Sequence, residues 1–160
     1  MSGYSNVTFD EIEIGATASA ERVVGQTEIE ALLLVSGDVV PFNLAAGVTV
    51  EPRDLCVEAV AAEAIISVML ERRLPGPGTR IVSQQLEFNG VIRVGDLVRA
   101  TVTVREKTAG NRRVLFDCTV DAAGETVLRG TVIVEAPHRK ASFPELSRPE
   151  FMIRRNDVFA

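Results

Sequence analysis

The second half of the chain contains four runs of strand length, and three of them alternate clearly between apolar and polar residues. The expected strands run from Ile81 to Phe88, Leu97 to Arg105, Arg113 to Asp121 and Thr126 to Glu135. The alternation of the second run is typical, with apolar side chains at Val98, Ala100, Val102 and Val104. Because successive side chains of a strand point to opposite faces, each such strand has one apolar face. The pattern predicts long antiparallel strands whose apolar faces need a cover.

One segment upstream of these strands supplies that cover. Apolar side chains recur at three- and four-residue spacing from about Asp54 to Arg73, which is typical of a helix surrounded by apolar contacts. The members of this pattern are Val57, Ala61, Ala64, Ile65 and Val68. The run Leu74-Pro-Gly-Pro-Gly-Thr79 ends the helix. We therefore expect an α+β domain in which a curved antiparallel sheet wraps around one long central helix.

The first half of the chain predicts smaller elements. Residues Thr17 to Val24 are expected to form a strand. Thr27 and Glu30 then match a capping box, in which two side chains satisfy backbone donors at a helix start, and the helix runs to about Val35. The following segment, Ser36 to Asn43, is polar and interrupted by proline. A loop of this kind between two helices is a natural place for functional residues.

Composition limits the classes of function. The 160 residues suffice for one domain core, so we expect a domain over residues 1–141 and a C-terminal tail over residues 142–160. The net charge of -5 argues against a nucleic-acid-binding protein, which needs a clustered basic surface. The single histidine, His138, excludes a His-rich zinc site. The sequence predicts neither a metal nor a cofactor.

The cysteines and the chain start indicate a cellular compartment. Cys56 and Cys118 lie in apolar contexts without paired spacing, and we interpret both as small buried thiols of a reducing cytosol. The first six residues lack the basic and apolar regions of a secretory signal. No stretch approaches the roughly 18 apolar residues that a membrane span needs. The expectation is a soluble, cytoplasmic protein without a membrane partner.

Several motifs in this order resemble those of the MaoC-like dehydratases, the (R)-specific enoyl-CoA hydratases of hot-dog fold. The matching pieces are Ser36-Gly37-Asp38 with Pro41, Leu74-Pro-Gly-x-Gly-Thr79, Gln84, Phe88 and Gly95-Asp96. The resemblance covers about residues 8 to 137. It implies a single hot-dog domain that adds water to, or removes it from, an acyl-CoA thioester in fatty acid metabolism. It also implies a homodimer or higher oligomer with the active site at the subunit junction.

The family's signature loop reads Gly-Asp-x-Asn-Pro-x-His, and its Asp and His jointly activate a water. In this chain the Asp position holds Asp38 and the proline is kept as Pro41, but the Asn position holds Val40 and the His position holds Asn43. The resemblance therefore implies Asp38 as the acid/base residue. An asparagine transfers no proton at neutral pH, so Asn43 is expected to orient the water through its amide. This departure predicts weakened or altered activity.

The central helix carries the other implied site residues. A His-Gly pair usually starts this helix in the family, and its positions hold Glu58 and Ala59. The backbone N–H of Ala59 is expected to polarise the thioester carbonyl, aided by the positive end of the helix. Glu58 either favours the helix dipole or supplies a carboxylate that is missing elsewhere. Ser67 falls where a family serine lines the active site.

Two other functions remain open at this point. A thioesterase could use Glu58 or Glu63 as its carboxylate, because hot-dog thioesterases place one on this helix. A non-catalytic subunit could instead bind an acyl-thioester without turnover, since half of the catalytic pair is absent. His138, after the last strand, is expected at the surface. Arg72, Arg73 and Arg80 flank the Pro-Gly loop and either meet a nucleotide phosphate of coenzyme A or lie in solvent.

Overall fold

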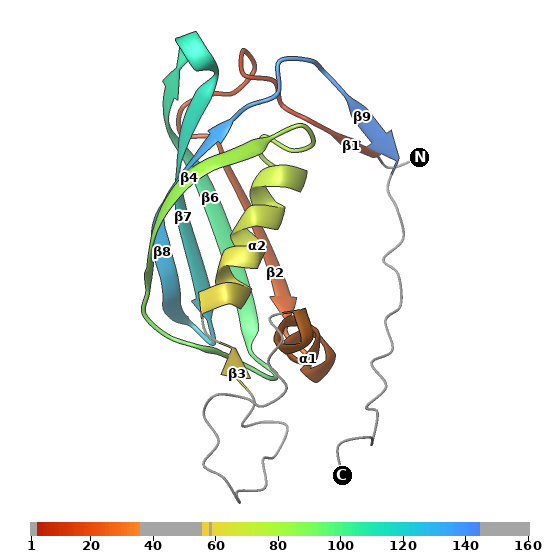
Figure 1. The fold of residues 1–160 in the computed structure, drawn as a ribbon, viewed down its shortest axis with the longest axis vertical. Coiled ribbons are helices and arrows are strands. Elements are labelled where there is room, and N and C mark those ends of the chain that lie inside the picture. The colour runs from red at the N-terminus through yellow and green to blue at the C-terminus, as the bar shows by residue number, and fades with distance from the viewer. Residues whose placement is uncertain (1–2, 36–55, 58, 145–160) are drawn as a thin grey trace, which may run out of the picture.

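The computed structural model describes residues 3–35, 56–57 and 59–144. Its main sheet has five antiparallel strands, which curve around one helix (Figure 1). Their spatial order is β2 (Thr17–Val23), β6 (Leu97–Thr108), β7 (Arg113–Ala122), β8 (Glu125–Glu135) and β4 (Arg80–Phe88). These are the five strands that the sequence predicts, with bounds that differ by a few residues at most. The predicted α+β sheet-and-helix architecture is confirmed.

The helix α2 (Ala59–Arg72) lies on the concave face of the sheet (Figure 1). Its buried side chains belong to Ala61, Ala62, Ile66, Met69 and Leu70. They pack on the inward positions of the long strands, which include Val98, Val102, Val104, Phe116, Val120, Leu128 and Val132. Small side chains at one end of the helix let it lie close to the sheet. The core is therefore one layer between the helix and the sheet.

The start of the central helix differs from the prediction. Cys56–Val57 forms the short strand β3, which pairs with β5 (Ile92–Arg93), and the helix begins at Ala59. The prediction of helix from about Asp54 is therefore wrong at residues 56–57. Pairing with a distant strand decides the local structure there, and helical periodicity cannot report such a contact. The predicted end near Arg73 is close to the observed end at Arg72.

The helix α1 (Gln26–Val35) is capped two residues earlier than predicted. The Gly25 N–H donates to the Glu28 carboxylate at 3.1 Å, and the Ile29 N–H donates to the Gly25 carbonyl at 3.4 Å. Gly25 and Glu28 thus take the places that Thr27 and Glu30 were predicted to hold, and that prediction is wrong. Arg22 also binds Glu28, with 2.7 Å between Nη2 and Oε1. The ion pair to the preceding strand favours Glu28 as the capping carboxylate.

A small second sheet joins the two ends of the described chain. Strand β1 (Gly3–Ser5) pairs with β9 (Ser142–Pro144), and Tyr4 lies opposite Phe143. In Figure 1 this pair stands apart from the main sheet. Three-residue strands have too little periodicity to be predicted from sequence. The rest of the expected tail, residues 145–160, lies outside the described residues.

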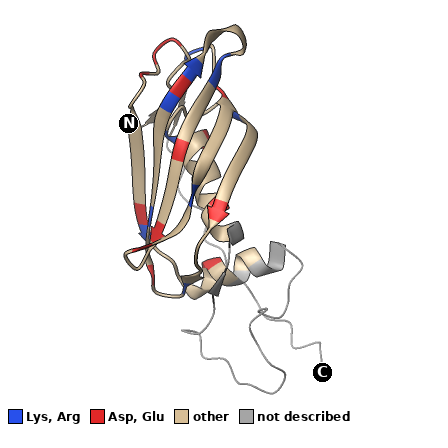
Figure 2. Cartoon of the chain, turned by 90° about the vertical axis from the view of Figure 1, so that its left-hand side faces the viewer, with Lys and Arg blue, Asp and Glu red and all other residues tan. Residues whose placement is uncertain are grey.

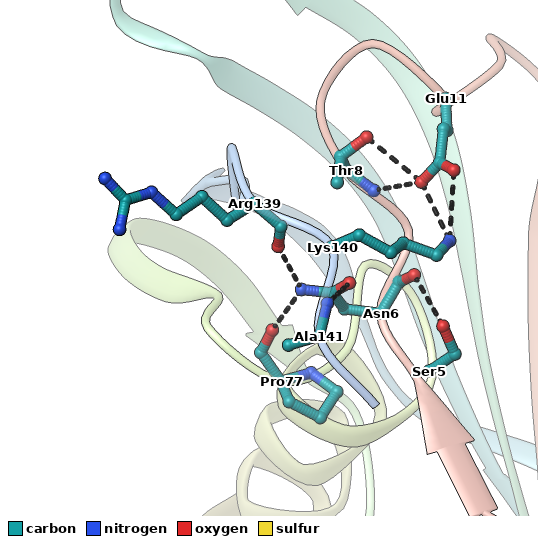
Figure 3. Close-up of polar contacts among 8 residues, drawn as sticks. All are labelled: Ser5, Asn6, Thr8, Glu11, Pro77, Arg139, Lys140 and Ala141. Carbon is teal, nitrogen blue, oxygen red and sulfur yellow. Dashed lines mark hydrogen bonds and ion pairs between the residues drawn. The ribbon is translucent and has the colours of Figure 1, made fainter. Parts of the chain in front are cut away.

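Asn6 fixes the base of this second sheet (Figure 3). Its side chain is buried, with only 1% of the residue exposed. Its Nδ2 donates to the carbonyls of Pro77 at 3.0 Å and Arg139 at 2.9 Å, and its Oδ1 accepts from the Ala141 N–H at 2.9 Å. Both N–H donors and the oxygen of this buried amide therefore have a hydrogen-bond partner. Asn6 therefore joins the N-terminal segment, the Pro-Gly loop after α2 and the segment after β8.

Candidate active site

The N-terminus of α2 offers hydrogen-bond donors for an anionic oxygen. The first N–H groups of a helix have no acceptor within the helix and carry partial positive charge. The α2 helix begins at Ala59, directly after β3, whose pairing with Ile92 and Arg93 fixes where the helix starts. Ile92 is itself buried, at 1% exposure. The backbone at Ala59 therefore lies at the positive end of the helix, and its role as an oxyanion donor stays a prediction.

Three predicted site residues, Asp38, Asn43 and Glu58, lie outside the described residues. The elements on either side of residues 36–55 are described: α1 ends at Val35 and β3 begins at Cys56. The α1 helix contacts both β3 and α2. The segment that carries Asp38 and Asn43 is thus joined at both ends to elements that adjoin the N-terminal end of α2.

Ser67 and Glu63 are half-buried and lie one turn apart on α2. The Glu63 carboxylate accepts a hydrogen bond from Nε2 of Gln84, which belongs to β4. Gln84 lies opposite the buried Val132 and therefore points to the concave side of the sheet. The sequence singled out Glu63 and Gln84 separately but did not predict that they meet. The sequence feature that could have indicated this contact is Gln84 itself, a polar residue at a position of its strand that points inward.

One apolar side chain on α2 and one on β4 are exposed. Val68 on α2 is 51% exposed and Phe88 on β4 is 46% exposed. Phe88 lies opposite the buried Leu128, so it faces the helix side of the sheet. Within the described part of the chain, β4 pairs with β8 alone, which leaves its other edge unpaired. The described residues thus leave one edge of β4 unpaired, with the exposed Phe88 on that strand.

The outer face of the sheet carries both basic and acidic residues (Figure 2), and several of them form ion pairs across neighbouring strands. A shallow depression of about 500 Å³ on this face lies over β4, β6, β7 and β8. Arg105 binds Asp117, and Nε of Arg129 donates to Glu87 at 2.9 Å, both within this depression. Because these charges satisfy one another and lie opposite α2, the depression is not a candidate active site.

Cys118 points away from that depression into the core. Its thiol is free and buried, and burial, with the nearby Asp117 charge, raises its pKa to about 12. A thiol with such a pKa is protonated and unreactive at neutral pH, which agrees with the prediction of a buried thiol. The side chain of Cys56 lies outside the described ones. His138 is exposed, as predicted.

Among residues 3–35, 56–57 and 59–144, no group of three or more His, Cys, Asp or Glu residues is placed to hold a metal ion. No helix among them is long and apolar enough to cross a membrane.

Known proteins resemble this chain over most of its length. It is 30% identical over 140 residues to a 3-hydroxybutyryl-CoA dehydratase of Methylorubrum extorquens, covering 85% of this chain and 88% of that protein. It is 32% identical over 133 residues to an (R)-specific enoyl-CoA hydratase of Rhodospirillum rubrum, covering 82% and 92%. The unliganded R-hydratase PhaJ1 from Pseudomonas aeruginosa superposes with a TM-score of 0.83 at 29% identity, covering 96% and 100%. No protein-family model matches the chain.

The sheet of five antiparallel strands around one helix, together with the superposition on a solved R-hydratase, defines a single hot-dog domain. The identity to two curated relatives over more than four-fifths of the chain is specific enough to name the family. The chain belongs to the MaoC-like dehydratases, the family of the (R)-specific enoyl-CoA hydratases.

Proposed function

We propose that this chain is an enoyl-CoA hydratase that adds water to a 2-enoyl-CoA to give the (R)-3-hydroxyacyl-CoA, and catalyses the reverse dehydration. The observation that carries the proposal is the match to a named dehydratase and a named hydratase over 85% and 82% of the chain. The N-terminal end of α2 supports it, because the first N–H groups of a helix carry partial positive charge and the reaction develops negative charge on the thioester oxygen.

Asp38 is the proposed acid/base residue. Its carboxylate takes a proton from water as the water oxygen bonds to Cβ of the enoyl group. The electron pair of the double bond moves toward the thioester oxygen, and the protonated Asp38 then returns a proton to Cα. One water is consumed and the carboxylate is regenerated. A carboxylate next to the apolar Val39, Val40 and Phe42 is suited to both steps, because an apolar setting raises its pKa.

Asn43 is proposed to hold the attacking water, while proton transfer is left to Asp38. An amide can accept from water and orient it, but it neither takes nor gives a proton at neutral pH. General acid–base groups typically contribute about 100- to 10,000-fold to a rate. Replacing the family's histidine by Asn43 is therefore expected to leave a slower enzyme, or one suited to another acyl group.

The backbone N–H of Ala59 is the proposed donor to the thioester oxygen. An oxyanion-hole donor of this kind contributes about 100- to 1,000-fold to kcat. Ser67, two turns further along α2 and half-buried, is proposed to line the acyl pocket. Glu58 is proposed to act through the helix dipole, since a carboxylate at a helix start stabilises the helix.

The proposed working form is a homodimer joined through β4. The edge of β4, which is unpaired among the described residues, and the exposed Phe88 on the same strand support this arrangement. Pairing two β4 edges would satisfy the free backbone groups of both subunits. Light scattering of the purified protein at micromolar concentration tests the assembly. A monomer under these conditions would contradict it.

Hydration of crotonyl-CoA, followed by loss of the enoyl absorbance, tests the activity. We expect turnover by the wild type, loss of at least about 100-fold in Asp38→Ala, and a gain in Asn43→His. Asp10→Ala, which removes an exposed carboxylate near the N-terminus, is the matched control and should keep wild-type activity.

The same assay separates the other functions. Release of free thiol with the alkene retained would indicate a thioesterase. Tight binding of crotonyl-CoA with no reaction in the wild type or in Asn43→His would indicate a non-catalytic binding subunit. The hydrogen bond from Gln84 to Glu63 speaks against Glu63 as a free catalytic carboxylate, because that oxygen already has a partner.

A further inference from the structure

The strand β4 contains a bulge that decides which of its residues face α2. Its register with β8 shifts between Ile81 and Ser83. After this shift, Gln84 lies opposite the buried Val132 and therefore faces the helix. Without the extra residue, Ser83 would lie opposite Val132, and Gln84 would point to the outer face. Bulges of this kind re-aim a side chain and are common next to active sites.

The bulge places a polar side chain on an otherwise apolar surface. The residues of β4 that follow Gln84 on the same side are Leu86 and Phe88. Nε2 of Gln84 donates to the carboxylate of Glu63 on α2. Within the described part of the chain, no lysine or arginine forms an ion pair with Glu63. The bulge thus supplies this half-buried carboxylate with a hydrogen-bond donor from the edge strand.

Glu63 lies one helical turn after Ala59, at which α2 begins. Residues four apart share one face of a helix, and a helical side chain leans over the turn that precedes its own Cα. Without a partner on β4, the Glu63 side chain would therefore lean toward the turn that starts at Ala59. The bond from Gln84 holds the carboxylate at the sheet instead.

The position of this carboxylate affects the proposed reaction. The first N–H groups of α2 carry partial positive charge, and that of Ala59 is the proposed donor to the thioester oxygen. Negative charge develops on that oxygen during hydration. A second negative charge beside the same turn would repel the developing charge, and the repulsion grows as the two charges come closer.

We propose that Gln84 is a positioning residue for hydration, because it holds the Glu63 carboxylate at β4 and away from the N-terminal turn of α2. This inference rests on the proposed function, with Ala59 as the donor to the thioester oxygen. Gln84 acts through Glu63 and needs no contact with the substrate. The bulge in β4 serves the same role, since it brings a long amide side chain to the place where Ser83 would otherwise lie.

Hydration of crotonyl-CoA by three variants tests this role. Gln84→Ala leaves the Glu63 carboxylate without its partner, and we expect kcat to fall about 10-fold through charge repulsion. KM should stay the same, because the charge opposes only the transition state. The double variant Glu63→Gln with Gln84→Ala also lacks the original bond but has no charge at residue 63, so its kcat should return to at least the wild-type value. Gln85→Ala, at the neighbouring residue on the outer face, is the matched control and should behave as the wild type.

A bond that only joins α2 to β4 would give a different result. The original bond is absent from both the single and the double variant, so a purely structural role predicts the same loss of kcat in both. Equal loss in the two variants therefore overturns the positioning role. Wild-type kcat in Gln84→Ala overturns it as well. Gln84 is exposed and Glu63 is half-buried, so both variants should fold.

A second thioester separates this inference from the proposed function. Acetoacetyl-CoA has no alkene to hydrate, and its enolate, which absorbs in the near ultraviolet, carries negative charge on the thioester oxygen. At one fixed pH, the enolate fraction of the bound thioester should fall in Gln84→Ala and recover in the double variant. If the wild type hydrates nothing but the variants show this pattern, the proposed function fails and the positioning role stands. An enolate fraction that is equal in all variants overturns the positioning role even where hydration is observed, and a wild type that binds neither thioester overturns both.

Discussion

Asn6 and Ala141 lie 135 positions apart in the sequence and hydrogen-bond to each other in both directions. The Asn6 backbone N–H donates to the Ala141 carbonyl at 3.1 Å, and the Ala141 N–H donates to the Asn6 side-chain oxygen at 2.9 Å. The side-chain amide nitrogen of Asn6 donates to the carbonyls of Pro77 and Arg139. One residue thereby connects three segments that the main sheet does not join.

Replacing Asn6 by alanine should destabilise the fold by about 3 kcal/mol, because it removes three part-buried hydrogen bonds to backbone groups, each worth about 1 kcal/mol. Asn6→Asp should be at least as harmful, since it presents a carboxylate to two carbonyls. Urea unfolding measures both. Asn89→Ala, at an exposed asparagine, should stay within about 0.5 kcal/mol of wild type. An equally small effect at Asn6 would show that the three contacts are dispensable.

The stability of the fold should depend on Glu11 at acidic pH. Its hydrogen bond from the Thr8 backbone, and then its bond from Lys140, lower its pKa from 4.5 to about 2. The group is depressed in the folded state, so its contribution is present above pH 4.5 and is lost as pH falls toward about 2.

Comparing wild type with Glu11→Gln by urea unfolding at several pH values checks this dependence. The wild type should be the more stable protein near neutral pH, and the difference should vanish at about pH 2. Glu13→Gln, at an exposed neighbour, is the matched control. A wild-type advantage that is the same at every pH would contradict the shifted pKa.

Gly130 of β8 should not tolerate a methyl group. A Cβ there would lie 2.1 Å from the Gln85 carbonyl oxygen and 2.8 Å from Cα of Leu86, both backbone atoms of β4. Overpacking against backbone is relieved only by moving a strand, so Gly130→Ala should cost about 3 kcal/mol. At Gly110 no atom lies within 4 Å of the added Cβ, and Gly110→Ala should be nearly neutral. Thermal melting of Gly130→Ala and Gly110→Ala measures the difference in stability. Equal melting temperatures for the two variants would contradict the close approach of β4 to Gly130.

Glu63 and Gln84 should be energetically coupled, because the hydrogen bond between them links α2 to the edge strand. A double-mutant cycle with Glu63→Ala and Gln84→Ala should give a coupling of about 0.5–1 kcal/mol, the value for a partly exposed bond. Gln85, the next residue of β4, points to the outer face. The cycle of Glu63→Ala with Gln85→Ala should therefore show no coupling, and a value as large as that for Gln84 would argue against a specific bond.

The long strands were predictable because each buries one face, and strict alternation such as Val98 to Val104 records that burial directly. The local sequence pattern predicted the wrong structure where a residue outside the segment decides it. Cys56–Val57 is a strand because of Ile92–Arg93, and the cap of α1 lies at Glu28, where Arg22 binds it.

The candidate site was predictable to a smaller extent. The helix α2 begins at Ala59 and not near Asp54 as expected, which places Ala59 at the helix start. The site roles of Ala59 and Ser67 stay predictions. The roles of Asp38, Asn43 and Glu58 remain predictions. The contact between Glu63 and Gln84 depends on how β4 pairs in the sheet, which no single segment of sequence specifies.

The bond between Asn6 and Ala141 also imposes an order on synthesis. A ribosome makes Asn6 near the beginning and its partners Arg139 and Ala141 near the end of the domain. Asn6 must therefore stay without these two partners while almost every strand of the sheet is translated, although Pro77 is made much earlier. The small sheet of β1 and β9 forms only when the segments around Asn6 and Ala141 have both been made.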